Sequence, residues 1–238
     1  MIKFFRHIRK SLIEKKQMGK YFKYAIGEII LVVIGILIAL QINNWNQQQK
    51  ENVFERKVLN EILSDTEEDI KQMKIAIKSI NESDLSYKYI INAFDKNLAY
   101  TDSMDTHFAY ALRFWSLSPN STAFETAKTE GLYFIKNDSI RFNLAKVNTY
   151  WYDYVKVLES RWQDYNTTIV QPYCLSLFDY YNLNKMKPTN YEKLKKDTTY
   201  KGILKSLKAM KIRYVETLNV RLNLVSELNE KLKDELDD

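Results

Sequence analysis

One stretch near the start of the chain is apolar without interruption. Residues 29–40 read IILVVIGILIAL, and Ala25, Ile26 and Ile42 extend the run to about 18 residues. A helix of that length reaches the lower limit for crossing roughly 30 Å of hydrocarbon, and a lone apolar run cannot form a closed barrel. The pattern therefore predicts a single transmembrane helix over residues 24–43.

A cleaved secretory signal is the alternative, because it also combines a basic start with an apolar middle. Such a signal has a shorter apolar region and then small residues at its cleavage site. Here the run ends ALQINNW at residues 39–45, and Trp45 suits an anchor at the headgroup layer. These flanks favour an uncleaved signal anchor.

Apolar residues then recur every three or four positions. Steps of four and three alternate without a break, as in a coiled-coil seam or a long helical bundle, at Leu59, Leu63, Thr66, Ile70, Met73, Ile77, Ile80, Asp84, Tyr87, Ile91 and Phe94. No proline interrupts this stretch, so the membrane helix is expected to continue into it. Thr66 and Asp84 fall on the seam, where they either set the helix register or lie in solvated gaps.

Two further long helices are predicted. One begins at Asn137 or Asp138, is ended or kinked by Pro172, and has its stripe at Ile140, Leu144, Val147, Trp151, Tyr154, Leu158, Trp162, Tyr165 and Ile169. The last runs from about residue 200 to residue 236. Asn229 lies on its stripe, where an asparagine either fixes register or is exposed at a fraying end.

Shorter segments complete the pattern. Residues 118–120 read as a turn, and Ser121 or Thr122 caps a short helix that ends near Gly131. The polar residues 182–199, which include Pro188, are expected to form a loop. The sequence thus predicts an all-α fold, in which the transmembrane helix continues into an elongated antiparallel helical bundle with coiled-coil-like seams.

The location of charge predicts the orientation of the anchor. The net charge is +6, and ahead of the apolar core Glu14 and Glu28 stand against eight bases: Lys3, Arg6, Arg9, Lys10, Lys15, Lys16, Lys20 and Lys23. Eight bases less two acids account for the whole excess, so residues 29–238 are neutral in sum. Because Lys and Arg crowd the cytoplasmic side of a span, residues 44–238 are expected on the outer side. This balance gives no support to nucleic-acid binding, which needs a basic patch on the folded domain.

Residues 1–23 have the pattern of a basic amphipathic helix, with Ile2, Phe5, Ile8 and Leu12 three or four apart. Such a segment suits the anionic cytoplasmic leaflet of a bilayer, and docking of a cytoplasmic partner is the alternative.

Three residues of the anchor could contact another membrane helix. Glu28 either pairs with Lys20 or Lys23 near the headgroups or makes a polar contact to a second helix. Gly35 and Ala39 form a small-xxx-small step that permits close helix approach.

Reactive side chains are few. His7 and His107 are the only histidines, and His107 near Asp102 and Asp105 is read as a solvated side chain in preference to a metal ligand. Cys174, the only cysteine, is read as a small buried hydrophobe, with a link between two chains as the alternative. We expect no metal, no cofactor and no catalysis.

Two clusters are candidate sites. Glu125, Lys128, Glu130 and Arg141 form either a polar interaction site or a helix cap with surface ion pairs. Trp115, Trp151 and Trp162, with nearby tyrosines, either line a ligand cleft or fill the core.

Two stretches together resemble a known bacterial family. The first is residues 1–10, MIKFFRHIRK, with residues 19–46, GKYFKYAIGEIILVVIGILIALQINNWN; the second is residues 122–141, TAFETAKTEGLYFIKNDSIR, continuing to Tyr150 and Trp151. They are similar to the Gram-negative membrane-protein family catalogued as domain of unknown function 6090, although Ala127 stands where a larger apolar residue is expected. The resemblance implies a single-pass inner-membrane protein with a periplasmic domain, and it brings no assigned activity and no catalytic residues.

The expected function is that of a periplasmic scaffold, adaptor or accessory subunit, held to the inner membrane as a homo-oligomer or as part of a membrane complex. The alternative is a ligand-sensing helical bundle that signals through a partner protein.

Overall fold

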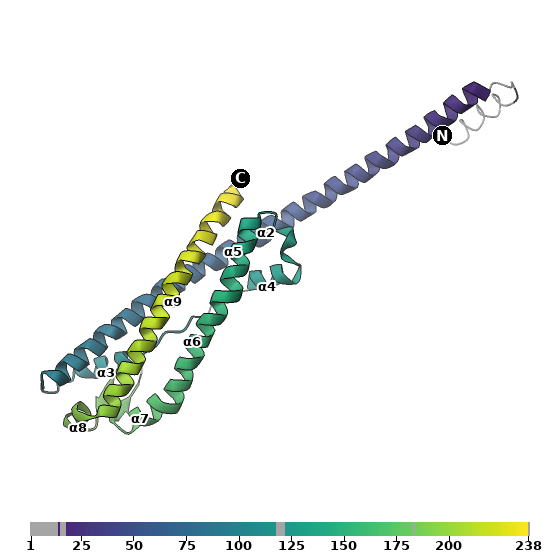
Figure 1. Ribbon diagram of the computed structural model, residues 1–238. Coiled ribbons are helices and arrows are strands. Elements are labelled where there is room, and N and C mark those ends of the chain that lie inside the picture. The colour runs from purple at the N-terminus through teal and green to yellow at the C-terminus, as the bar shows by residue number, and fades with distance from the viewer. Residues whose placement is uncertain (1–13, 15–17, 118–121, 183, 238) are drawn as a thin grey trace. The chain divides into compact units, whose positions relative to one another are not determined.

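The computed structural model describes residue 14 and residues 18–117, 122–182 and 184–237 of the chain. The chain divides into two units, residues 1–55 and residues 56–238. Helix α2 (Met18–Asp95) contains the apolar stretch and also supplies the first long helix of the second unit (Figure 1). Most of the amphipathic helix expected over residues 1–23 lies outside the described residues, as do the turn at residues 118–120 and the candidate cap Ser121.

The apolar part of α2 is long and apolar enough to cross a membrane. Its best 18-residue window has a mean hydropathy of 2.6, and none of that window is buried. A signal sequence near the N-terminus of a chain would pass the same test of length and composition. The finding therefore supports either a membrane anchor or a signal.

The second unit is built mainly from helices. After α2 come α3 (Met104–Leu112), α4 (Thr122–Thr129), η1 (Leu132–Phe134), α5 (Asp138–Lys146), η2 (Val147–Trp151), α6 (Tyr152–Tyr165), η3 (Asn166–Val170), α7 (Gln171–Leu175), β1 (Phe178–Tyr181), β2 (Met186–Pro188), α8 (Tyr191–Lys196) and α9 (Thr198–Asp237). Strands β1 and β2 form a short antiparallel hairpin with an irregular register between Phe178 and Tyr180.

Helices α2 and α9 pack antiparallel, and the run from α5 to α6 packs against them (Figure 1). Every predicted seam position of α2 is buried or half-buried. The same holds for the stripe that the sequence predicts on α9: Val215, Leu218, Leu222, Val225, Asn229, Leu232 and Leu236. The core has two parts, one among α2, α4, α5, α6 and α9, and one around the far end of α2 with α3, α7, the hairpin and α8. The predicted all-α bundle is confirmed.

Polar side chains cross the buried interface between α2 and α9. Asn229 Nδ2 donates to Thr66 Oγ1 at 2.9 Å, and both residues are buried, so of the two readings left open by the sequence the contact favours register over exposure. Arg221, 1 % exposed, forms an ion pair with Asp69 at 3.0 Å. At the end of the interface Arg56 donates to the carbonyl oxygen of Leu236. Each contact joins one specific position of α2 to one of α9.

Two π-helical segments interrupt the run from α5 to α7. A π turn inserts one residue relative to an α-helix and so rotates the following face by about 100°. After η3, Val170 is fully buried and Ile169 is 46 % exposed. The prediction that Ile169 continues the stripe was therefore wrong, since it assumed an uninterrupted α-helical period.

The segment expected to be a loop contains structure. Residues 182–199 include β2 and α8, with Met186 and Leu194 buried in the second part of the core. The side chain of Asn190 caps α8 by accepting from Lys193 N at 2.9 Å. The loop prediction was wrong because a three-residue strand and a six-residue helix are too short to give a periodic signal.

The short helix α4 ends as expected. Gly131 has a φ of +80°, a conformation that L side chains rarely adopt, and it leads from α4 into η1. Asp65 of α2 holds the start of α4 by accepting from Ala123 N at 3.4 Å. Burial raises the pKa of Asp65 above its usual value.

The Arg221–Asp69 pair gives a test of the interface. The Asp69→Ala variant leaves a buried guanidinium without its carboxylate, and we expect a loss of about 3–5 kcal/mol in the free energy of unfolding. Adding Arg221→Met removes that charge and should restore most of the loss. Urea unfolding of the full chain in lipid nanodiscs, followed by circular dichroism, measures both. A double variant as unstable as Asp69→Ala alone would contradict this account.

Candidate functional site

The four residues of the predicted polar site belong to two separate sets of contacts. Glu125 and Lys128 form an exposed ion pair on α4 at 3.8 Å, and Glu130 is exposed just after that helix. Arg141 lies on α5, and among the described residues no hydrogen bond or ion pair joins it to the other three. An exposed ion pair of this kind contributes a few tenths of a kcal/mol.

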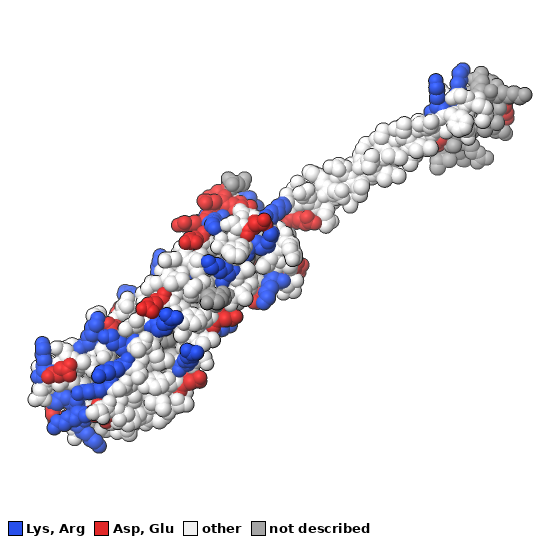
Figure 2. Space-filling view, in the orientation of Figure 1, with Lys and Arg blue, Asp and Glu red and all other residues white. Residues whose placement is uncertain are grey.

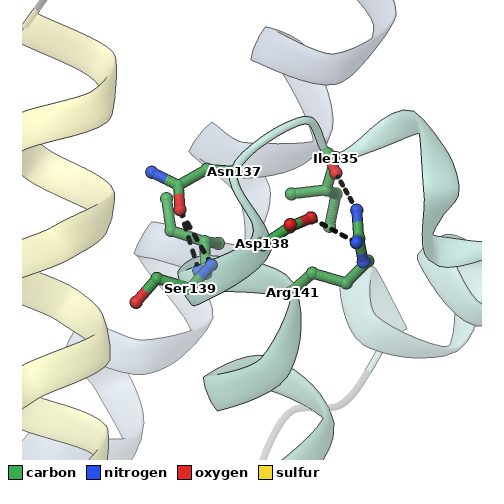
Figure 3. Close-up of polar contacts among 6 residues, drawn as sticks. Ile135, Asn137, Asp138, Ser139 and Arg141 are labelled. Carbon is green, nitrogen blue, oxygen red and sulfur yellow. Dashed lines mark hydrogen bonds and ion pairs between the residues drawn. The ribbon is translucent and has the colours of Figure 1, made fainter.

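Arg141 fixes the entry to α5 (Figure 3). Its guanidinium donates to the carbonyl oxygen of Ile135 at 2.9 Å and to the carboxylate of Asp138. Asn137 caps the helix, as the sequence predicted, because its side-chain oxygen accepts from Ser139 N at 3.0 Å and Ile140 N at 3.2 Å. The contacts of Arg141 therefore close a turn and begin a helix.

The anchor residues lie on α2 within the first unit. At 100° per residue, Glu28, Gly35 and Ala39 fall within about 40° of one line along the helix. A Cβ added to Gly35 would meet no atom within 4 Å, and Trp45 is exposed. A second helix could therefore approach α2 closely at Gly35.

Lys211 is a buried charge-bearing residue that the sequence analysis missed. Its Nζ donates to Ser83 Oγ at 2.6 Å and to the carbonyl oxygen of Ala111 at 2.7 Å. Ser83 donates in turn to the carbonyl oxygen of Tyr110 at 2.6 Å. Both carbonyls lie in the last turn of α3, where the carbonyl oxygen of Tyr110 also accepts from Arg113 N at 3.1 Å, so α2 and α9 together cap that helix. The missed signal is spacing: Lys211, Tyr214, Leu218 and Arg221 are three or four apart on one stripe.

The remaining reactive groups are also enclosed. Burial raises the pKa of the Cys174 thiol to about 12, and the fully buried sulfur supports the reading of a small hydrophobe over a link between chains. His107 lies on α3 and stacks on Tyr89, with ring centroids 4.1 Å apart. The expectation of a solvated histidine on an acidic loop was therefore wrong. Among the described residues no cluster of three metal-binding side chains occurs.

An aromatic cleft of about 260 Å³ lies between α6 and α9. Phe114 stacks on Trp162 with ring centroids 4.3 Å apart, and it also contacts Tyr214 at 4.9 Å. The cleft is lined by Phe114, Leu158, Arg161, Trp162, Ala209, Met210, Arg213 and Tyr214. It exceeds the roughly 150 Å³ of a cavity that binds benzene. A substituted aromatic ring or a short acyl chain would fit.

Polar groups border this cleft. Glu159 accepts from the hydroxyl of Tyr214 and from Leu117 N, the latter at 2.8 Å, and burial is the main cause of a raised pKa for Tyr214. Arg213 donates to the hydroxyl of Tyr154 at 2.8 Å. The indole nitrogen of Trp162 is buried and has no hydrogen-bond partner among the described residues. The sequence left a ligand cleft or a core position open for Trp115, Trp151 and Trp162, and of these Trp162 alone is among the residues that line this cleft.

The environment of Lys211 predicts a pH dependence of stability. Burial lowers its pKa to about 7, whereas an unfolded lysine titrates near 10.5. Between these values the unfolded chain binds one more proton than the folded chain, so stability rises with pH in that window and is level below it. The slope should be about 1.4 kcal/mol per pH unit.

The Lys211→Met variant should lose this slope, because methionine does not titrate. Urea unfolding of both proteins from pH 6 to pH 10 gives the difference directly. If the difference in stability between them stays constant across that range, the lysine is not held in a low-pKa environment.

The comparisons with known proteins identify a family. Residues 28–171 match a family of unknown function, DUF6090, from the apolar stretch of α2 to the first residue of α7. No curated protein and no solved structure gives a significant match. Since the matched residues are more than half of the sequence, the chain belongs to the DUF6090 family.

Proposed function

We propose that the chain is a scaffold or adaptor anchored in the bacterial inner membrane, which acts through protein–protein contacts and without catalysis. Residues 24–43 span the bilayer once, the basic N-terminus stays in the cytoplasm, and residues 44–238 form a periplasmic domain. The observation that carries this proposal is α2, one helix that holds an entirely unburied apolar window and also forms a long wall of the bundle.

The enclosed reactive groups support a non-catalytic role. The sulfur of Cys174 and the side-chain nitrogen of Lys211 are potential nucleophiles, and both are buried in packing or capping contacts. Glu28, Gly35 and Ala39 lie along one line of α2, and small residues on such a line let membrane helices approach closely. This arrangement supports self-association or contact with another membrane subunit.

A second candidate function, the sensing of a small ligand, is favoured by the aromatic cleft. Its apolar lining suits the hydrocarbon part of a small ligand, and Arg161 and Arg213 supply positive charge for an anionic group. An aromatic or short-chain carboxylate combines both features. In that role the bundle would pass the signal to a partner protein.

Native mass spectrometry of the full chain, released from membranes in mild detergent, separates the two functions. The scaffold predicts a fixed oligomer or co-purifying membrane subunits. Gly35→Leu should disrupt that assembly, whereas Val33→Leu, which lies off the line of small residues, should not. A monomer that retains a small molecule, with the ligand lost in the Arg161→Gln/Arg213→Gln variant, would contradict the scaffold and support the sensor.

A further inference from the structure

The neutral sum of residues 29–238 conceals a strongly basic region. Residues 182–211 contain nine lysines and no arginine, against only Glu192 and Asp197. They form β2, α8 and the beginning of α9, where Figure 2 shows blue side chains gathered at one end of the second unit. The opposite end of that unit holds Arg56 and Leu236.

Three of the nine lysines are ion-paired or buried, and a fourth, Lys201, has its Nζ 5.7 Å from the centroid of the Phe94 ring. Lys195 pairs with Glu192 at 2.9 Å, Lys208 lies 4.0 Å from Asp84, and Lys211 is buried. Among the described residues no ion pair neutralises the other six, which are exposed or half-buried and which we call the lysine tip: Lys185, Lys187, Lys193, Lys196, Lys201 and Lys205.

One pair of lysines in the tip weakens the helix that carries it. Lys201 and Lys205 are four residues apart on α9, a spacing at which like charges repel. The first turn of α9 holds no acidic residue, although Asp197 just before it caps the helix by accepting from Tyr200 N at 2.8 Å. Local rules of this kind are usually broken where a surface has a function.

Apolar side chains accompany the charges. Leu98 is 43 % exposed, and its carbonyl oxygen accepts from the hydroxyl of Tyr191 on α8 at 3.1 Å. Leu175 is 63 % exposed at the end of α7, two residues before Leu177, whose carbonyl oxygen accepts from Thr189 N at 2.9 Å. Exposed leucines beside lysines suit an interface between headgroups and acyl chains.

Lysine predominates over arginine at this end, because residues 182–211 contain no arginine and Arg113, which reaches Asn184, is engaged there in a hydrogen bond of 3.1 Å. Arginine recognises carboxylates and phosphates through a rigid two-pronged geometry, whereas lysine acts as a mobile point charge. Six mobile charges fit a surface of many anionic groups without fixed positions. A phospholipid surface has that character, and each lysine near it contributes attraction.

We propose that the lysine tip docks on an anionic phospholipid surface, with Leu98 and Leu175 entering its headgroup layer. This inference rests on the proposed adaptor function and names the class of partner that this end of the domain contacts. Its failure is distinguishable from failure of the scaffold, because binding to added vesicles is measured whatever the oligomeric state.

The test uses the full chain in nanodiscs of neutral phosphatidylcholine. Lys3, Arg6, Arg9, Lys10, Lys15 and Lys16 are changed to Gln in every sample, so that most of the basic charge of the N-terminal segment is removed. Fluorescent vesicles with 30 % phosphatidylglycerol are added at low salt, and co-flotation with the nanodiscs gives the affinity. The six lysines of the tip are changed to Gln in one variant. A matched control changes six exposed lysines elsewhere in the second unit: Lys57, Lys71, Lys74, Lys78, Lys128 and Lys146.

We expect the tip variant to bind at least about 100-fold more weakly than the control, because roughly six charges near the surface are lost. Binding should also fall steeply in 0.5 M salt and be absent with pure phosphatidylcholine vesicles. Circular dichroism checks that both variants keep the helical fold. Equal binding by both variants, or binding to duplex DNA or polyphosphate with none to the vesicles, would overturn the proposal.

Discussion

Helices α2 and α9 pack antiparallel, and the buried polar side chains of their interface find their partners in only one register. Asn229 reaches Thr66, Arg221 reaches Asp69, and Lys211 reaches Ser83 across the same interface. Sliding either helix by a turn would leave these groups buried without partners, at a cost of roughly 1–3 kcal/mol for each neutral group and more for the charged ones. Apolar packing favours association of the helices, and the polar contacts select one alignment of their axes.

The parts of the fold that depend on a long regular period were predictable from the sequence. The seam from Leu59 to Phe94, the Asn137 cap and the end of α4 at Gly131 follow from spacing or from local backbone chemistry. Elements set by tertiary contact were not. Helices α3 and α8 are too short to show a period, and the π segments displace Ile169 from a face that a uniform helix would bury. Lysine and arginine are usually solvated, so the burial of Lys211 and Arg221 shows only in their spacing.

The same reasoning bears on the candidate site. Glu125, Lys128 and Arg141 were grouped because they are near in sequence, and the structure gives them separate local roles. The aromatic cleft brings together Phe114, Trp162 and Tyr214 from distant segments. Of these three residues, the sequence analysis named only Trp162 as a candidate for a cleft. Net charge hid the lysine tip, because acidic residues elsewhere cancel it in the sum. For an anchored adaptor, α2 offers a single helix for the membrane and the bundle, and the tip offers a charged surface at the end of the bundle away from Arg56.

Disulfide cross-linking tests the register of α2 and α9 most directly. In a Cys174→Ala background, the Thr66→Cys/Asn229→Cys pair is compared with Thr66→Cys/Leu222→Cys and Thr66→Cys/Leu236→Cys, each shifted by one heptad along α9. A disulfide forms readily only when the Cα atoms lie within about 7 Å. This account predicts rapid cross-linking of the first pair alone. Comparable cross-linking of either shifted pair would show that the buried polar contacts do not fix the alignment of the two helices.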